Sequence, residues 1–116
     1  GLQQTFVECD EHMWRLGNRT LPANIQFTGG SDWFVLSKEF VQYLVTGSGP
    51  MLSGLNDIYD LTLLPAETYF HTALRNSDFC RTFVDNNLRM VNWKRKSGCR
   101  CLHRDVVDWC GCSPNV

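Results

Sequence analysis

The chain has 116 residues, of which 43% are hydrophobic, including seven Phe and four Trp, and its formal net charge is −1. This length allows at most one domain with a real core, and the aromatic content excludes a disordered chain. The charge gives no reason to expect nucleic acid as a partner, and no apolar run reaches the roughly 18 residues of a transmembrane helix.

Residues 5–9 (Thr-Phe-Val-Glu-Cys) predict a short strand that ends in an acidic cluster. Within it, Glu8 and Asp10 form an acid-x-acid pair, a spacing at which two carboxylates can share a divalent cation. Acidic residues at strand ends are also commonplace, so we assign no metal and no cofactor. His12, Met13 and Trp14 come next, and a polar stretch then runs through Pro22. Within it, Asn18 begins an Asn-Arg-Thr sequon, a candidate glycosylation site.

The central motif is the run Gly-Gly-Ser-Asp-Trp-Phe at residues 29–34. Its two glycines allow a sharp turn or the close approach of a ligand. Asp32 and Trp33 then present a carboxylate and an indole, and a flexible turn held by a packed helix can aim these two groups at a ligand. The alternative is that Asp32 only ends a turn and Trp33 belongs to the core.

Two helices are predicted on either side of a weakly helical stretch at 51–63. The first begins after Ser37, which can cap it, and the second begins at Pro65, a residue suited to the first helical position. Their expected buried faces are Phe40, Val41, Leu44 and Val45 in the first, and Ala66, Phe70, Ala73 and Leu74 in the second. Glu67 would then lie in a first helical turn, either as a functional acid or as a carboxylate that only stabilises the helix dipole.

Further along, residues 79–84 and 88–93 predict two short strands joined by Asp-Asn-Asn. A basic run at 94–104 is either a solvated face or a surface for a phosphorylated or polyanionic ligand.

Four cysteines close to the end allow three pairings, and opposed residues in an antiparallel ribbon have a constant sum of positions. The nested bonds Cys99–Cys112 and Cys101–Cys110 fit one such register. Zinc is the alternative, although zinc pairs usually have wider C-x2-4-C spacing. Cys9 and Cys80 remain, either paired together, reduced, or bonded to another part of a longer chain.

Taken together, several motifs resemble the peptide O-xylosyltransferases of the core-2-branching type. The segments that carry the resemblance are residues 8–17, 29–34, 63–67, 84–89 and 107–115, the last of which reads Val-Asp-Trp-Cys-Gly-Cys-Ser-Pro-Asn. The resemblance covers nearly all of the chain.

The resemblance implies an inverting enzyme that transfers xylose from UDP-xylose to a serine of a proteoglycan core protein. It implies an α/β, GT-A-like fold in which residues 1–116 form the second half of one catalytic domain, completed by a missing N-terminal half. The parent protein would be a type II membrane protein of the Golgi lumen, and the fragment alone would be inactive.

The same resemblance suggests roles for individual residues. Glu67 matches the general base of the wider family, and Asp32 is expected to contact the xylose or to serve as the base instead. Trp33 would pack against the sugar. Ser113 would reach the donor from the segment held by the nested disulfides Cys99–Cys112 and Cys101–Cys110. Cys80 resembles a cysteine bonded to the missing half.

Two alternatives stay open at this point. One is an N-acetylglucosaminyl branching enzyme on the same scaffold. The other is a noncatalytic module that binds glycosaminoglycan or acidic core peptide through the basic run.

Overall fold

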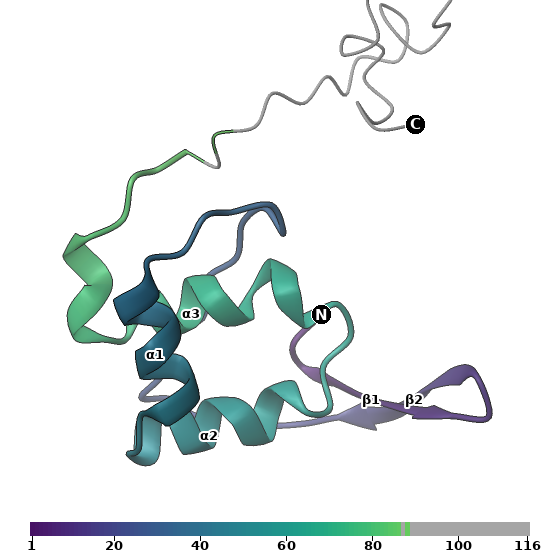
Figure 1. Cartoon of the computed structure of the whole chain (residues 1–116). Helices are drawn as coiled ribbons and strands as arrows, with labels where there is room; N and C mark the ends of the chain where they lie inside the picture. Colours follow the sequence, from purple (N-terminus) through teal and green to yellow (C-terminus); the bar gives the residue numbers. More distant parts are fainter. Residues whose placement is uncertain (87, 89–116) are drawn as a thin grey trace, which may run out of the picture.

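The computed structural model describes residues 1–86 and 88. Its elements are β1 (Gln4–Cys9), β2 (His12–Asn18), α1 (Lys38–Thr46), α2 (Pro50–Tyr59), the 3-10 helix η1 (Pro65–Glu67), α3 (Tyr69–Arg75) and the 3-10 helix η2 (Asp78–Arg81). Figure 1 shows the three α-helices grouped together and the β1–β2 hairpin projecting to one side of them. The described chain is thus a small mixed helix-and-strand unit.

The hairpin confirms the strand expected at 5–9 and adds a second strand that was not expected. β2 pairs antiparallel with β1, and Cys9 lies opposite His12. The two connecting residues, Asp10 and Glu11, have φ angles of 52° and 59°. Positive φ at both central residues is the arrangement of a type I′ turn, whose twist matches that of the flanking strands. The polar stretch expected between Trp14 and Pro22 therefore begins inside β2, which runs as far as Asn18.

Arg19 joins the base of the hairpin to the C-terminal end of α2. Its Nε donates to the carbonyl of Leu2 at 2.7 Å, and its Nη1 donates to the carbonyl of Ile58 at 2.6 Å. A backbone bond from Phe6 to the carbonyl of Leu61, 2.9 Å long, adds to the joint. Desolvation lowers the pKa of the guanidinium below its ordinary value, yet an arginine stays cationic at neutral pH.

The helices share a small hydrophobic core. Its buried hydrophobic members among the described residues are Ile25, Phe40, Leu52, Leu55, Tyr59 and Ala73. Leu55 in α2 and Ala73 in α3 are both 0% exposed and belong to the same buried cluster, so the two helices share this core.

Helix α1 begins as expected, because the Ser37 side chain accepts the Phe40 amide at 3.2 Å. Its buried face is narrower than the spacing predicted. Phe40 is buried and Leu44 packs against the core, but Val41 and Val45 are 41% and 77% exposed. A helix of nine residues that contacts its neighbours on one side buries a single stripe, so the adjacent valines face outward.

The stretch expected to be weakly helical contains α2, whereas the helix expected at Pro65 is divided. Pro65 begins the short helix η1. The helical conformation is interrupted at Thr68, whose φ is −135°, and α3 then begins at Tyr69. Ala66 is consequently exposed, while Ala73 is buried as predicted.

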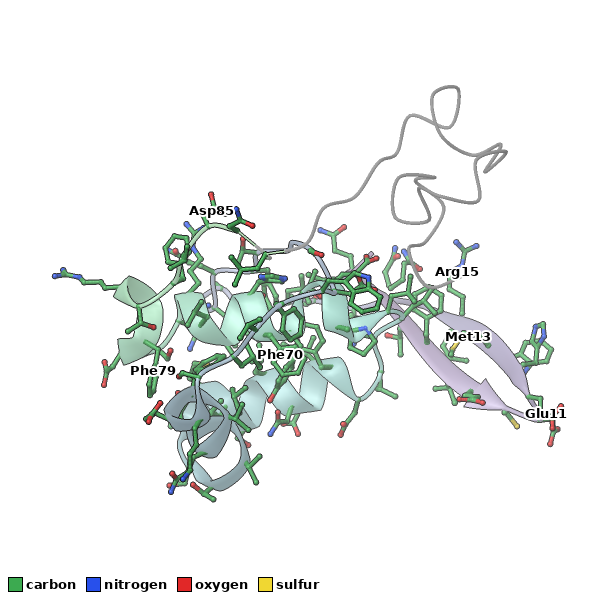
Figure 2. All side chains as sticks on the ribbon, turned by 45° about the horizontal axis from the view of Figure 1, so that its top comes forward. Glu11, Met13, Arg15, Phe70, Phe79 and Asp85 are labelled. Carbon is green, nitrogen blue, oxygen red and sulfur yellow. The ribbon has the colours of Figure 1, made fainter. Side chains whose placement is uncertain are left out.

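The prediction of a strand at 79–84 was wrong. Residues 78–81 form η2, which Ser77 caps by accepting the Phe79 amide at 3.3 Å. The centroid of the Phe79 ring lies 5.4 Å from the ring centroid of Phe40 and 5.5 Å from that of Tyr43. Figure 2 shows Phe79 turned toward the helices. The strand expected at 88–93 lies outside the described residues apart from Leu88.

Candidate functional site

The glycine turn of residues 29–31 lies directly against the segment that runs from Glu67 into α3. The Gly30 amide donates to the Glu67 carbonyl at 2.9 Å. One helical turn later, Nε2 of His71 lies 2.8 Å from the Ser31 carbonyl. Two segments about 40 residues apart in sequence are thus held together by hydrogen bonds at two neighbouring points.

Glycine is required in this turn because of close approach. A Cβ on Gly30 would lie 2.8 Å from Cε1 of His71 and 3.0 Å from its Nε2. A Cβ on Gly29 would lie 3.0 Å from Cγ2 of Thr68. The sequence predicted a sharp turn or the close approach of a ligand, whereas the groups that approach these glycines are the protein's own Thr68 and His71.

Asp32 and Glu67, the two candidate acids, lie next to this contact. Glu67 supplies the carbonyl that Gly30 binds, and Asp32 follows the residue whose carbonyl His71 binds. Both residues are exposed to solvent. The fold therefore brings the two acid-bearing segments together and leaves both residues accessible.

Trp33 is not a core residue, because 54% of it is exposed. Its amide donates to the Ser31 hydroxyl at 3.0 Å, a local bond that shapes the turn around Asp32. The alternative in which Trp33 fills the core is thus excluded, and its indole is accessible to a ligand.

A groove of about 960 Å³ runs beside the turn. It is lined by Ser31, Trp33 and Phe34 and by Phe70 and His71 from α3, and Phe83, Val84 and Leu88 add further apolar groups. Neither Asp32 nor Glu67 is part of the lining. The groove therefore lies beside the glycine turn without including either acid, and its lining is mainly aromatic and aliphatic.

Sequence reasoning missed His71. It lies four residues after Glu67 on what was expected to be one helix, a spacing that places two side chains on the same face. That spacing was the available signal, but the partner of the ring is a carbonyl 40 positions earlier in the chain.

The acid-x-acid pair belongs to the hairpin. Glu8 pairs with Met13 across the strands, and Asp10 occupies the turn. Within residues 1–86 and 88, no group of three or more His, Cys, Asp or Glu side chains could hold a metal ion. Cys9 and Cys80 are exposed free thiols, so they are not bonded to each other.

Some predicted features cannot be compared with the structure. Ser113, the pairs Cys99–Cys112 and Cys101–Cys110, and the basic run at 94–104 all lie outside the described residues. Asn18 is described: it is exposed, and its side-chain oxygen accepts a hydrogen bond from Gln4. In the part of the chain that the structure describes, no helix has the length and apolar character to cross a membrane.

Comparison with known proteins agrees with the motifs. The profile of the Core-2/I-Branching enzyme family matches residues 2–116. The chain is 58% identical to xylosyltransferase 2 of Homo sapiens and 58% identical to xylosyltransferase oxt of Drosophila pseudoobscura pseudoobscura. It is 55% identical to a xylosyltransferase of Ciona intestinalis. These alignments cover 99% of this chain but only 13–14% of each relative. The chain belongs to the Core-2/I-Branching enzyme family.

Proposed function

We propose that this chain is part of the catalytic domain of a protein xylosyltransferase, which transfers xylose from UDP-xylose to a serine of a proteoglycan core protein with inversion. The names of relatives at 55–58% identity support this activity. The observation that carries the proposal within the structure is the hydrogen bond between Gly30 and Glu67, since it joins the two segments that bear the candidate acids.

Inverting transfer needs a base that removes the serine proton while its oxygen attacks the anomeric carbon. We assign this role to Glu67. This residue is exposed to solvent, and its backbone carbonyl accepts a hydrogen bond from the Gly30 amide. A positioned carboxylate contributes about 10²–10⁴-fold in such proton transfer. Asp32 contacts the xylose from the neighbouring turn, and it is the second candidate for the base.

Trp33 supplies an apolar surface to the sugar in this proposal. Its exposed indole lines the groove beside the turn, and an aromatic face packs well against the C–H groups of a pyranose. Ser113 completes the donor site from the part of the chain beyond the described residues.

The wider assignment follows the family. The chain would be the second half of a GT-A-like domain whose N-terminal half supplies most of the nucleotide pocket, with Cys80 bonded to that half. The two nested disulfides would clip the C-terminal ribbon, Asn18 would be available for glycosylation, and the whole protein would be anchored as a type II membrane protein in the Golgi lumen.

The intact protein tests this assignment in a donor screen. It is incubated with UDP-xylose or UDP-N-acetylglucosamine and with a Ser-Gly peptide, and the matched control is the same peptide with Ala in place of Ser. We expect transfer from UDP-xylose to the serine peptide alone. Transfer of N-acetylglucosamine instead, or no transfer from either donor, would contradict the proposal.

A further inference from the structure

His71 touches the glycine turn on two sides, and its imidazole is half-buried. Nε2 lies 2.8 Å from the Ser31 carbonyl, and the ring occupies the space that a Cβ on Gly30 would need. The imidazole and the Phe34 ring form a T-shaped pair, with ring centroids 5.8 Å apart and an interplanar angle of 86°. Because a carbonyl oxygen can only accept, Nε2 carries the hydrogen in this contact.

The two hydrogen bonds at this contact fix two particular peptide planes. The Ser31 carbonyl belongs to the planar unit that also contains the amide and Cα of Asp32. The Glu67 carbonyl, bound by the Gly30 amide, belongs to a plane that contains the Cα of Glu67 itself. One bond therefore orients the backbone of Asp32 and the other orients that of Glu67.

We propose that His71 is a positioning residue that sets the placement of Asp32 relative to Glu67 by binding the Ser31 carbonyl. The proposal rests on the function proposed above, because it concerns the geometry of those two acids. His71 touches neither acid's side chain in this account. It acts through the peptide plane that carries Asp32, and the missing Cβ of Gly30 lets the ring reach it.

Transfer kinetics of the intact protein test this role with three variants of His71. Phe keeps a ring and loses the donor, Gln restores an N–H donor, and Ala removes the ring. We expect His71→Phe to lower kcat by about tenfold or more while the KM for UDP-xylose changes less than about threefold, because misalignment by about 1 Å has a large effect on turnover. Gln should recover most of the lost kcat. If the Phe variant retains wild-type kcat, or if Gln recovers nothing, the positioning role is wrong.

A double-mutant cycle tests the contact between Gly30 and the ring. In the wild-type background, Gly30→Ala should lower kcat, since the added methyl meets the imidazole. In the His71→Ala background, the same change should alter kcat by less than about twofold, because the obstructing ring is absent. Gly54→Ala is the matched control: its Cβ would lie 4.0 Å from Ile25 Cδ1, an ordinary contact. An equal effect of Gly30→Ala in both backgrounds would contradict the proposal.

Amide hydrogen exchange separates this inference from the proposed activity. The Gly30 amide, which donates to Glu67, should be protected in the wild type, and His71→Phe should speed its exchange about tenfold or more, since one of the hydrogen bonds that hold the turn against α3 is lost. A protein that transfers no xylose but shows this change refutes the function and retains the contact. Exchange at Gly30 that does not respond to His71→Phe refutes the positioning role whatever the activity.

Discussion

Thr72 anchors the chain immediately before the glycine turn. Among the residues that the structure describes, Thr72 alone is both polar and buried, and 0% of it is exposed. Its hydroxyl accepts the Thr28 amide at 3.1 Å and donates to the Thr28 carbonyl at 3.0 Å. Since Thr28 directly precedes Gly29, this pair of bonds fixes the entry of the turn that carries Asp32.

Thr72→Val should therefore destabilise this region. The substitution keeps the shape of the side chain but leaves the amide and carbonyl of Thr28 without their partner, which costs about 1–3 kcal/mol. Hydrogen exchange at the Thr28 amide measures the change in the free energy of local opening. Thr46→Val is the matched control, because Thr46 is exposed and its hydroxyl bonds only within α1. Equal effects of the two substitutions would show that the buried network has no special role.

The hairpin turn at Asp10 and Glu11 was not predicted from the sequence. Asp10 and Glu11 both have positive φ, yet neither is the glycine or asparagine that usually adopts this conformation. Because the segment lacks an Asn-Gly signal, no turn was predicted at Asp10 and Glu11, and Glu8 and Asp10 were noted only as an acidic pair at the end of a strand. β2 was missed for the same reason.

The Asp10→Asn/Glu11→Gly variant should stabilise the hairpin by about 1 kcal/mol, since Asn and Gly tolerate the left-handed region better. Exchange of the amides in β1 and β2 measures the gain. Asp10→Ala/Glu11→Ala is the control at the same positions, because alanine keeps the left-handed strain while also removing both charges. If the alanine variant gains as much as Asn-Gly, charge repulsion rather than backbone strain is the cause.

Elements were predictable where a local signal decided them. The Ser37 cap located α1, and the short run rich in β-branched and aromatic residues at 5–9 located β1. The strand expected at 79–84 failed because Phe79, a good strand residue, packs against Phe40 and Tyr43 instead. Likewise, the helix expected at Pro65 is interrupted at Thr68, just after the residue whose carbonyl binds a glycine from a distant segment.

In the candidate site, too, the residues with a local sequence signal were predicted and the residue that depends on a distant contact was not. Asp32 and Glu67 were selected from their motifs and from a family resemblance, and the fold brings their segments together. His71 was not selected, because its importance depends on a contact between residues 40 positions apart. No local pattern contains that contact.

The described chain also leaves large hydrophobic side chains uncovered. Trp14 and Trp33 are each 54% exposed, and Leu16 is 66% exposed. Figure 2 shows the hairpin, with Met13 on it, standing away from the helices. On the function proposed above, the rest of the catalytic domain would cover the hairpin residues Trp14 and Leu16, whereas Trp33 would stay open to the sugar.

Residues 1–116 expressed alone should therefore behave as an incomplete domain. We expect a broad thermal transition and binding of a hydrophobic dye, because few side chains are buried and many apolar ones are exposed. Calorimetry and dye fluorescence provide the measurement, and the complete catalytic domain under the same conditions is the control. A sharp two-state transition without dye binding would show that the chain folds independently.

The role of Glu67 as the base is tested most directly by the turnover of Glu67→Gln in the intact protein, with UDP-xylose and a serine peptide. We expect kcat to fall by at least about a hundredfold, because the amide cannot accept the serine proton. Glu11→Gln at the tip of the hairpin (Figure 2) should stay within about twofold of wild type, as for a remote surface change. Asp32→Asn in the same assay covers the second candidate for the base. Near-normal turnover in both Glu67→Gln and Asp32→Asn would contradict the catalytic account.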